Sequence, residues 1–151
     1  EVDEIENTNI LKASLKAMRL ACIAVLDQLK LQIGNIPYEI VNSDGSLDYL
    51  KTLTLVDGDK LIPEYSLPQQ FVIKGDSKSA AIAAASILAK VTRDRYMEKL
   101  DSEYPQYCWT KNAGYLTKGH IEAIDKYGLT PYHRPSFLKK HFAKQKQMSL
   151  F

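Results

Sequence analysis

Two short apolar runs in the middle of the chain each end near an aspartate, and they constrain the fold more than any other feature. Leu53–Val56 stops at Asp57-Gly58, and Phe71–Ile73 is followed by Lys74-Gly75-Asp76. β-Branched and apolar residues that stop at turn formers are typical of short buried strands. Helical spacing precedes the first run and follows the second, so the sequence predicts an α/β layer structure.

Apolar residues spaced by three and four positions predict three amphipathic helices around these strands. They cover residues 11–29 after a cap at Thr8 or Asn9, a segment from Ser77 or Ser79 through Tyr96, and a segment from the cap Thr117 to Tyr127. Two shorter elements are expected before the first apolar run, a strand at Tyr38–Val41 and a helix at Leu47–Lys51. No repeat or long linker divides the chain.

The net charge of the chain is small but unevenly distributed. It is +2 at pH 7, with basic residues gathered between Lys74 and Lys99 and between Arg134 and Lys146. Overall basicity therefore does not indicate a nucleic-acid partner, and any such contact would depend on these local groups.

Cysteine usage and the lack of long apolar stretches bear on location. Cys22 and Cys108 are expected to be two reduced, packed thiols. No run approaches the roughly 18 apolar residues that cross a bilayer, and the acidic N-terminus does not resemble a signal peptide. These features predict a cytoplasmic protein with no membrane partner.

Asp57 and Asp76 would lie at the same edge of the sheet if the two strands are parallel neighbours, and open α/β sheets bind ligands at that edge. Two close carboxylates repel each other unless a divalent cation such as Mg²⁺ or Mn²⁺ lies between them. The pair therefore suits metal-assisted phosphodiester hydrolysis. Taken singly, each aspartate is also explained as a turn former or a helix cap.

The residues around Asp76 form a distinctive block. Phe71-Val-Ile-Lys-Gly-Asp-Ser-Lys-Ser79, followed by Ile82-Ala-Ala-Ala-Ser-Ile-Leu-Ala-Lys-Val-Thr-Arg-Asp-Arg95, closely resembles the most recognisable block of the ribonuclease HII family. Further matching motifs occur in the family's order along nearly the whole chain: Leu55-Val-Asp-Gly58, Tyr104-Pro105, Gly114-Tyr-Leu-Thr-Lys118, His120 and His133-Arg-Pro-Ser-Phe137.

The resemblance implies a ribonuclease H-like fold, with a central mixed sheet flanked by helices, as a catalytic domain over residues 1–142. It implies an endonuclease of DNA replication and repair that cleaves the RNA strand of RNA–DNA hybrids and cuts at ribonucleotides embedded in DNA. Asp57 and Asp76 match the third and fourth acidic metal ligands of the family. Both would be catalytic and would bind Mg²⁺ or Mn²⁺.

Substrate contacts are implied in the same way. Tyr115 matches the tyrosine that stacks on the sugar at the RNA-to-DNA junction and helps to sense the 2′-hydroxyl, the group that distinguishes RNA from DNA. Polar and basic side chains would hold phosphates without reading sequence; the candidates are Lys74, Lys78, Lys90, Thr117, Lys118 and Arg134. For any one of the charged candidates, a solvated surface charge is the competing interpretation.

One family motif is missing from these residues. The first two acidic ligands lie in an Asp-Glu-x-Gly-Arg-Gly segment, and Asp3-Glu4 is not followed by Gly-Arg-Gly. The leading strands of the sheet are therefore expected to be absent from this chain, and the chain alone is expected to be inactive. The alternatives are a non-catalytic module that binds nucleic acid or a sliding clamp, and a different phosphatase or nuclease on the same layout.

The C-terminal segment 143–151 is expected to be a cationic tail outside the catalytic domain. Its end, Gln147-Met-Ser-Leu-Phe151, resembles the pentapeptide by which bacterial proteins bind the sliding clamp. Gln147, Met148, Leu150 and Phe151 would then fill a groove on the clamp. The competing interpretation is that these side chains pack back on their own domain or fray.

Overall fold

The structure is a computed structural model that describes residues 2–30, 48 and 51–148. The chain divides into two compact units. We call residues 10–87 the strand unit, and residues 1–9 together with 88–151 the helical unit. The strand expected at Tyr38–Val41 and most of the helix expected at Leu47–Lys51 lie outside the described residues.

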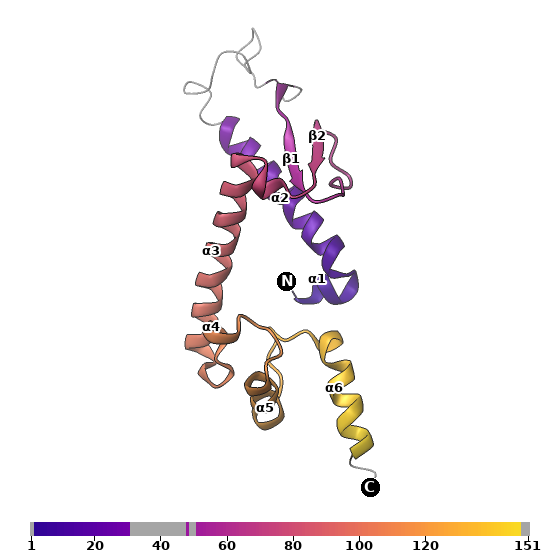
Figure 1. Ribbon diagram of the computed structural model, residues 1–151, viewed down its shortest axis with the longest axis vertical. Coiled ribbons are helices and arrows are strands. Elements are labelled where there is room, and N and C mark those ends of the chain that lie inside the picture. The colour runs from indigo at the N-terminus through magenta and orange to yellow at the C-terminus, as the bar shows by residue number, and fades with distance from the viewer. Residues whose placement is uncertain (1, 31–47, 49–50, 149–151) are drawn as a thin grey trace. The chain divides into compact units, whose positions relative to one another are not determined.

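In the described residues, two consecutive strands lie between helices that precede and follow them in the chain (Figure 1). The α-helices are α1 (Val2–Asn7), α2 (Ile10–Lys30), α3 (Ala80–Glu103), α4 (Trp109–Asn112), α5 (Lys118–Tyr127) and α6 (Pro135–Met148). The strands are β1 (Thr54–Asp57) and β2 (Gln69–Val72), and two short 3₁₀ helices are η4 (Gly75–Ser77) and η5 (Pro105–Tyr107). The three helices predicted from apolar spacing are thereby confirmed as α2, α3 and α5.

In the strand unit, β1 and β2 form a parallel pair. The register places Thr54 opposite Gln69 and Asp57 opposite Val72. Val56 is buried with Ile62 and Tyr65, and Cys22 of α2 packs against this cluster, so α2 lies against the strands (Figure 1). The α/β class is confirmed, and the sheet within the described residues consists of these two strands.

The loop from β1 to β2 is held by the side chain of Gln69 instead of by a helix. Its amide oxygen accepts from the backbone N–H of Ile62 at 2.7 Å, and its amide nitrogen donates to the carbonyls of Ile62 and Tyr65 at 3.0 and 3.2 Å. Buried backbone groups require such partners. The Gln69 side chain therefore provides hydrogen-bond partners for three backbone groups of the loop beside the core.

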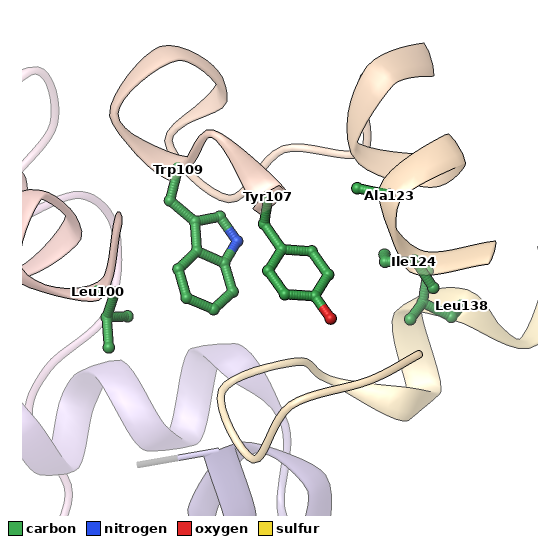
Figure 2. Close-up of a cluster of buried hydrophobic side chains, with 6 residues drawn as sticks. All are labelled: Leu100, Tyr107, Trp109, Ala123, Ile124 and Leu138. Carbon is green, nitrogen blue, oxygen red and sulfur yellow. The ribbon is translucent and has the colours of Figure 1, made fainter. Parts of the chain in front are cut away.

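The helical unit has an aromatic core. Figure 2 shows its six buried side chains: Leu100 of α3, Tyr107, Trp109, Ala123 and Ile124 of α5, and Leu138 of α6. The rings of Tyr107 and Trp109 are stacked, with centroids 5.2 Å apart. Met97, Tyr104 and Leu116 pack against this cluster. α5 begins where the sequence predicts, since the Thr117 hydroxyl accepts from the backbone N–H of His120 at 3.3 Å.

One expectation about a particular residue is not met. Cys108 is exposed instead of packed, and it takes a left-handed conformation (φ 49°) between η5 and α4. α6 continues to Met148, so the expected cationic tail is helical over residues 143–148; Ala, Lys, Gln and Met all favour helix. Among the described helices, none combines the length and the apolar content that crossing a membrane requires.

Candidate functional site

Asp57 is the last residue of β1, and its carboxylate is held by the main chain after β2. Oδ1 accepts a hydrogen bond from the backbone N–H of Gly75 at 2.8 Å. The register explains the contact, because Asp57 lies opposite Val72 and the turn of η4 follows shortly after that strand. The bond fixes the Asp57 carboxylate against the short helix that carries Asp76.

Gly75 leaves no room for a side chain at this contact. A Cβ atom there would lie 2.5 Å from Cδ1 of Ile82 and 3.1 Å from Oδ1 of Asp57. The first distance is far below van der Waals contact, so a side chain would push against α3 and against the carboxylate. The glycine between Lys74 and Asp76 is therefore required for space at the site.

Asp76 lies in η4, and the turn before it is tightly shaped. Lys74 adopts a left-handed conformation (φ 55°), and its carbonyl accepts from the Ser77 hydroxyl at 2.9 Å. Asp57 and Asp76 are both exposed. β1 and β2 are confirmed as parallel neighbours, with Asp57 at the end of β1 and Asp76 in the short helix after β2. That the two carboxylates share one metal site stays a prediction.

The oxygen chemistry of this edge fits a hard divalent cation. Carboxylate oxygens are the ligands that Mg²⁺ and Mn²⁺ prefer, and exposed carboxylates keep oxygens available for them. Within the described part of the chain, however, no group of three or more acidic, histidine or cysteine side chains gathers as a metal site would need. Asp57 and Asp76 therefore fit as part of a ligand set.

Tyr115 lies in the helical unit, on the loop between α4 and α5. Its side chain is 71% exposed, although Leu116 beside it packs against the core. Ala113 and Gly114 before it take positive φ angles of 49° and 78°, which turn the chain sharply. Tyr115 is therefore presented to solvent and is not packed into a loop interior.

The main chain around Tyr115 is firmly bonded. Its N–H donates to the carbonyl of Asn112 at 2.8 Å, and its carbonyl accepts from the N–H of Thr117 at 2.8 Å. The buried Asn112 side chain accepts from the N–H of Gly114 and donates to the carbonyl of Tyr107. An exposed ring on such a backbone loses little freedom when it stacks on a ligand.

Two buried histidines continue this network beneath the loop. Nδ1 of His120 lies 2.9 Å from the Tyr115 carbonyl, and Nε2 of His120 lies 3.1 Å from Nε2 of His133. Trp109 donates its indole N–H to Nε2 of His120 at 3.3 Å. Sequence patterns did not single out Trp109 or Asn112, and the two histidines appeared only within the family motifs.

Burial lowers the pKa of His133 from its ordinary value of 6.5 to about 4, and the neighbouring His120 adds to the shift. A protonated imidazole in this place would have to leave water and face a second ring that is also buried. His133 is therefore neutral at physiological pH.

The remaining substrate candidates are divided between the two units. Lys74 and Lys78 lie beside the carboxylates in the strand unit, and both are exposed. The others belong to the helical unit: Lys90 on α3, Thr117 at the cap of α5, Lys118 in its first turn, and Arg134 before α6.

Some of these side chains already have partners. Lys118 pairs with Glu122 at 3.9 Å, and the Arg134 guanidinium lies over the Phe137 ring at 4.1 Å from its centroid. Sequence reasoning gave no site role to Arg93, which donates to the carbonyl of Ala113 at 2.6 Å and so braces the Tyr115 loop. In the sequence, Arg93 is recognisable only as one basic residue on the exposed face of α3.

The C-terminal candidates are partly outside the described residues. α6 includes Gln147 and Met148, whereas Leu150 and Phe151 lie beyond the described range.

Comparison with known proteins agrees with the order of these motifs. The ribonuclease HII family model matches residues 3–145. Proteins named ribonuclease HII from Desulfotalea psychrophila, Christiangramia forsetii and Parabacteroides distasonis are 47, 45 and 44% identical over 133, 134 and 135 residues. These alignments cover 88 or 89% of this chain and 50 or 57% of the relatives, so the chain spans about half the length of the curated relatives it matches.

The match runs through both units, from the helix that precedes the strands to α6. It includes the edge that carries Asp57 and Asp76 and the loop that carries Tyr115. The chain therefore belongs to the ribonuclease HII family.

Proposed function

We propose that this chain is the part of a metal-dependent endonuclease that cleaves RNA strands paired with DNA and cuts at ribonucleotides embedded in DNA. The observation that carries the proposal is the contact between the Asp57 carboxylate and the backbone of Gly75, directly before Asp76. It anchors the Asp57 carboxylate beside the short helix that carries Asp76, inside a chain of the ribonuclease HII family.

Asp57 and Asp76 would hold Mg²⁺ or Mn²⁺ in this proposal. Bound divalent ions supply a water of lowered pKa and stabilise the charge on the departing oxygen. The chain's own contribution is orientation, because the Gly75 N–H occupies one oxygen of Asp57 and so limits how the carboxylate can rotate. A ligand held in this way does not have to be ordered when the ion binds.

Tyr115 would stack on the sugar of the ribonucleotide. The exposed ring supports this role, as does the firm bonding of the backbone on either side of it. Lys74, Lys78 and Lys90 would bind phosphates, as would Thr117, Lys118 and Arg134, and would add affinity for any duplex without adding preference for RNA.

Two further acidic ligands are required for activity in this proposal. The 151 residues contain no Asp-Glu-x-Gly-Arg-Gly motif, and the described residues offer no third ligand beside Asp57 and Asp76. The chain alone should therefore bind duplexes and not cut them.

Complementation tests this proposal. The chain would be joined to the N-terminal portion of the Christiangramia forsetii ribonuclease HII, which is 45% identical over the aligned region. We expect the joined protein to cut a duplex with one embedded ribonucleotide in Mg²⁺ or Mn²⁺ and to leave the all-DNA duplex intact. Binding without cutting by a folded joined protein would instead favour the non-catalytic binding module.

We propose in addition that the last five residues bind a sliding clamp. Met148, Leu150 and Phe151 would be the apolar anchors, and α6, which ends at Met148, would lead into the motif. Removing residues 147–151 should abolish capture of the chain by an immobilised bacterial clamp. Unchanged capture would contradict the assignment.

The free cysteines Cys22 and Cys108 are in keeping with action in the reducing cytoplasm.

A further inference from the structure

The Tyr115 carbonyl lies at the end of a hydrogen-bonded chain through two buried histidines. His120 and His133 are 3% and 7% exposed, and their Nε2 atoms are 3.1 Å apart. Two imidazole nitrogens at this distance share one proton, so one ring must donate and the other must accept.

The surrounding donors determine which ring donates. The backbone N–H of Thr130 points to Nδ1 of His133 at 3.0 Å, so this nitrogen must be the acceptor and the proton must lie on Nε2 of His133. Nε2 of His120 then accepts, from His133 and from the indole N–H of Trp109. The proton of His120 is left on Nδ1, where it faces the Tyr115 carbonyl at 2.9 Å.

We infer that His120 and His133 are positioning residues, which fix the main chain of Tyr115 and thereby the ring that contacts the ribonucleotide. The inference rests on the proposed function of Tyr115. His133 holds His120 in the tautomer that donates, and His120 supplies the Tyr115 carbonyl with a second donor besides the N–H of Thr117.

The rings around the pair restrict any other arrangement. Tyr107 and Trp109 lie 4.9 and 5.4 Å from the His133 ring by centroid, and both belong to the buried core of the unit. A ring flip of either histidine would place a proton against a donor or a lone pair against a carbonyl, at the cost of a buried unsatisfied group. Hydrogen bonds through the two histidines therefore connect the backbone of Thr130 to the carbonyl of Tyr115.

The tautomers can be tested directly in the unsubstituted chain. Long-range ¹H–¹⁵N spectra at neutral pH should show His120 protonated on Nδ1 and His133 on Nε2. The opposite tautomer at His120 would overturn the inference, because its Nδ1 would then be unable to donate to the carbonyl. This measurement needs no substitution and does not depend on what the protein binds.

A matched pair of variants tests the effect on recognition. The amide nitrogen of Asn can take the place of Nδ1, so His120→Asn keeps the donor, whereas His120→Leu removes it. The readout is the ratio of dissociation constants for an all-DNA duplex and the same duplex with one ribonucleotide, measured in EDTA so that nothing is cut. We expect H120L to lower this ratio about threefold to tenfold, the effect of one hydrogen bond, and H120N to leave it near the wild-type value.

The outcomes separate the inference from the proposed function. If Tyr115→Ala lowers the ratio and a folded H120L does not, the positioning role is overturned and the role of Tyr115 stands. Equal losses in H120L and H120N also overturn it, because the donor would not be what matters. A wild-type ratio of one contradicts the role proposed for Tyr115 itself. If H120L does not fold, the tautomers of the wild-type chain decide.

Discussion

The sheet edge with Asp57 and Asp76 and the loop with Tyr115 are built in opposite ways. The edge rests on two strands and on one side chain to main chain contact, from Asp57 to Gly75. The loop rests on an aromatic core, a capped helix and a network of buried hydrogen bonds. Within the described residues, the candidate reactive edge has part of its ligand set, whereas the candidate recognition loop has all the contacts that hold its backbone.

The two units also differ in their buried clusters. In the strand unit, the buried cluster consists of Val56, Ile62 and Tyr65. In the helical unit, the interior is closed by Tyr107, Trp109 and Leu138, each no more than 3% exposed. The backbone of the Tyr115 loop is therefore held by contacts within one unit, whereas the proposed metal ligands depend on the pairing of two strands.

The largest expected effect concerns the edge. In the joined protein, Asp57→Asn or Asp76→Asn should lower cleavage more than about a hundredfold, since even the hydrogen-bond partners of metal ligands cost up to that factor. Asp59→Asn is the matched control, because Asp59 is exposed and paired with Lys60 at 3.4 Å. Cleavage rates in Mg²⁺ measure the effect. Full activity of D57N would mean that the Asp57 carboxylate is not needed for cleavage.

The next effect is on stability, at the contact that shapes the edge. Gly75→Ala should destabilise the chain by about 1–3 kcal/mol, the usual range for overpacking, because the new Cβ meets Ile82 and Asp57. Gly119→Ala is the control, since a Cβ at this helical position on α5 meets nothing within 4 Å and alanine favours helix. Urea unfolding compares them. Equal stabilities of the two variants would show that Ile82 and Asp57 can move aside for a Cβ at position 75 without loss of stability.

Sequence patterns predicted the edge better than the loop. β-Branched and apolar runs that stop at Asp57 and before Asp76 are local signals, and they predicted both strands. If the strands were parallel neighbours, both aspartates would lie at one edge of the sheet. The required space at Gly75 was not predicted, because it depends on Ile82 of a helix that begins later in the chain.

The support of the loop could not be read from the sequence. His120 and His133 are far apart in the chain, and a lone histidine carries no sign of a partner. Cys108 and Ala113 take positive φ angles that their residue types do not favour, so tertiary packing determines them. The exposure of Tyr115 likewise depends on how Leu116 packs beside it.

A smaller effect is expected from the titration of the loop's support. The pKa of His133 is about 4 in the folded chain and near 6.5 when unfolded, so the unfolded chain takes up the proton first as the pH falls. Stability should therefore decrease from pH 6.5 towards pH 4, by at most about 1.4 kcal/mol per pH unit for one proton.

His133→Gln removes this titration and keeps a donor at the position of Nε2. Urea unfolding at several pH values should show a shallower decrease for the variant than for the wild-type chain. The ion pair of His141 with Asp125 is present in both proteins and cancels in the difference. Parallel curves would mean that His133 does not hold the loop in its neutral form.

The smallest expected effect separates affinity from preference. Lys78→Gln in the strand unit and Lys118→Gln in the helical unit should each weaken binding of all duplexes alike and lower the slope of log affinity against log salt by about one. Lys118 already pairs with Glu122, so its loss should cost less than that of Lys78. Tyr115→Ala should instead leave the slope of log affinity against log salt unchanged and abolish the preference for the ribonucleotide. A lysine variant that changes the preference for the ribonucleotide would contradict the assignment of the lysines to phosphates, because a phosphate contact cannot sense a 2′-hydroxyl.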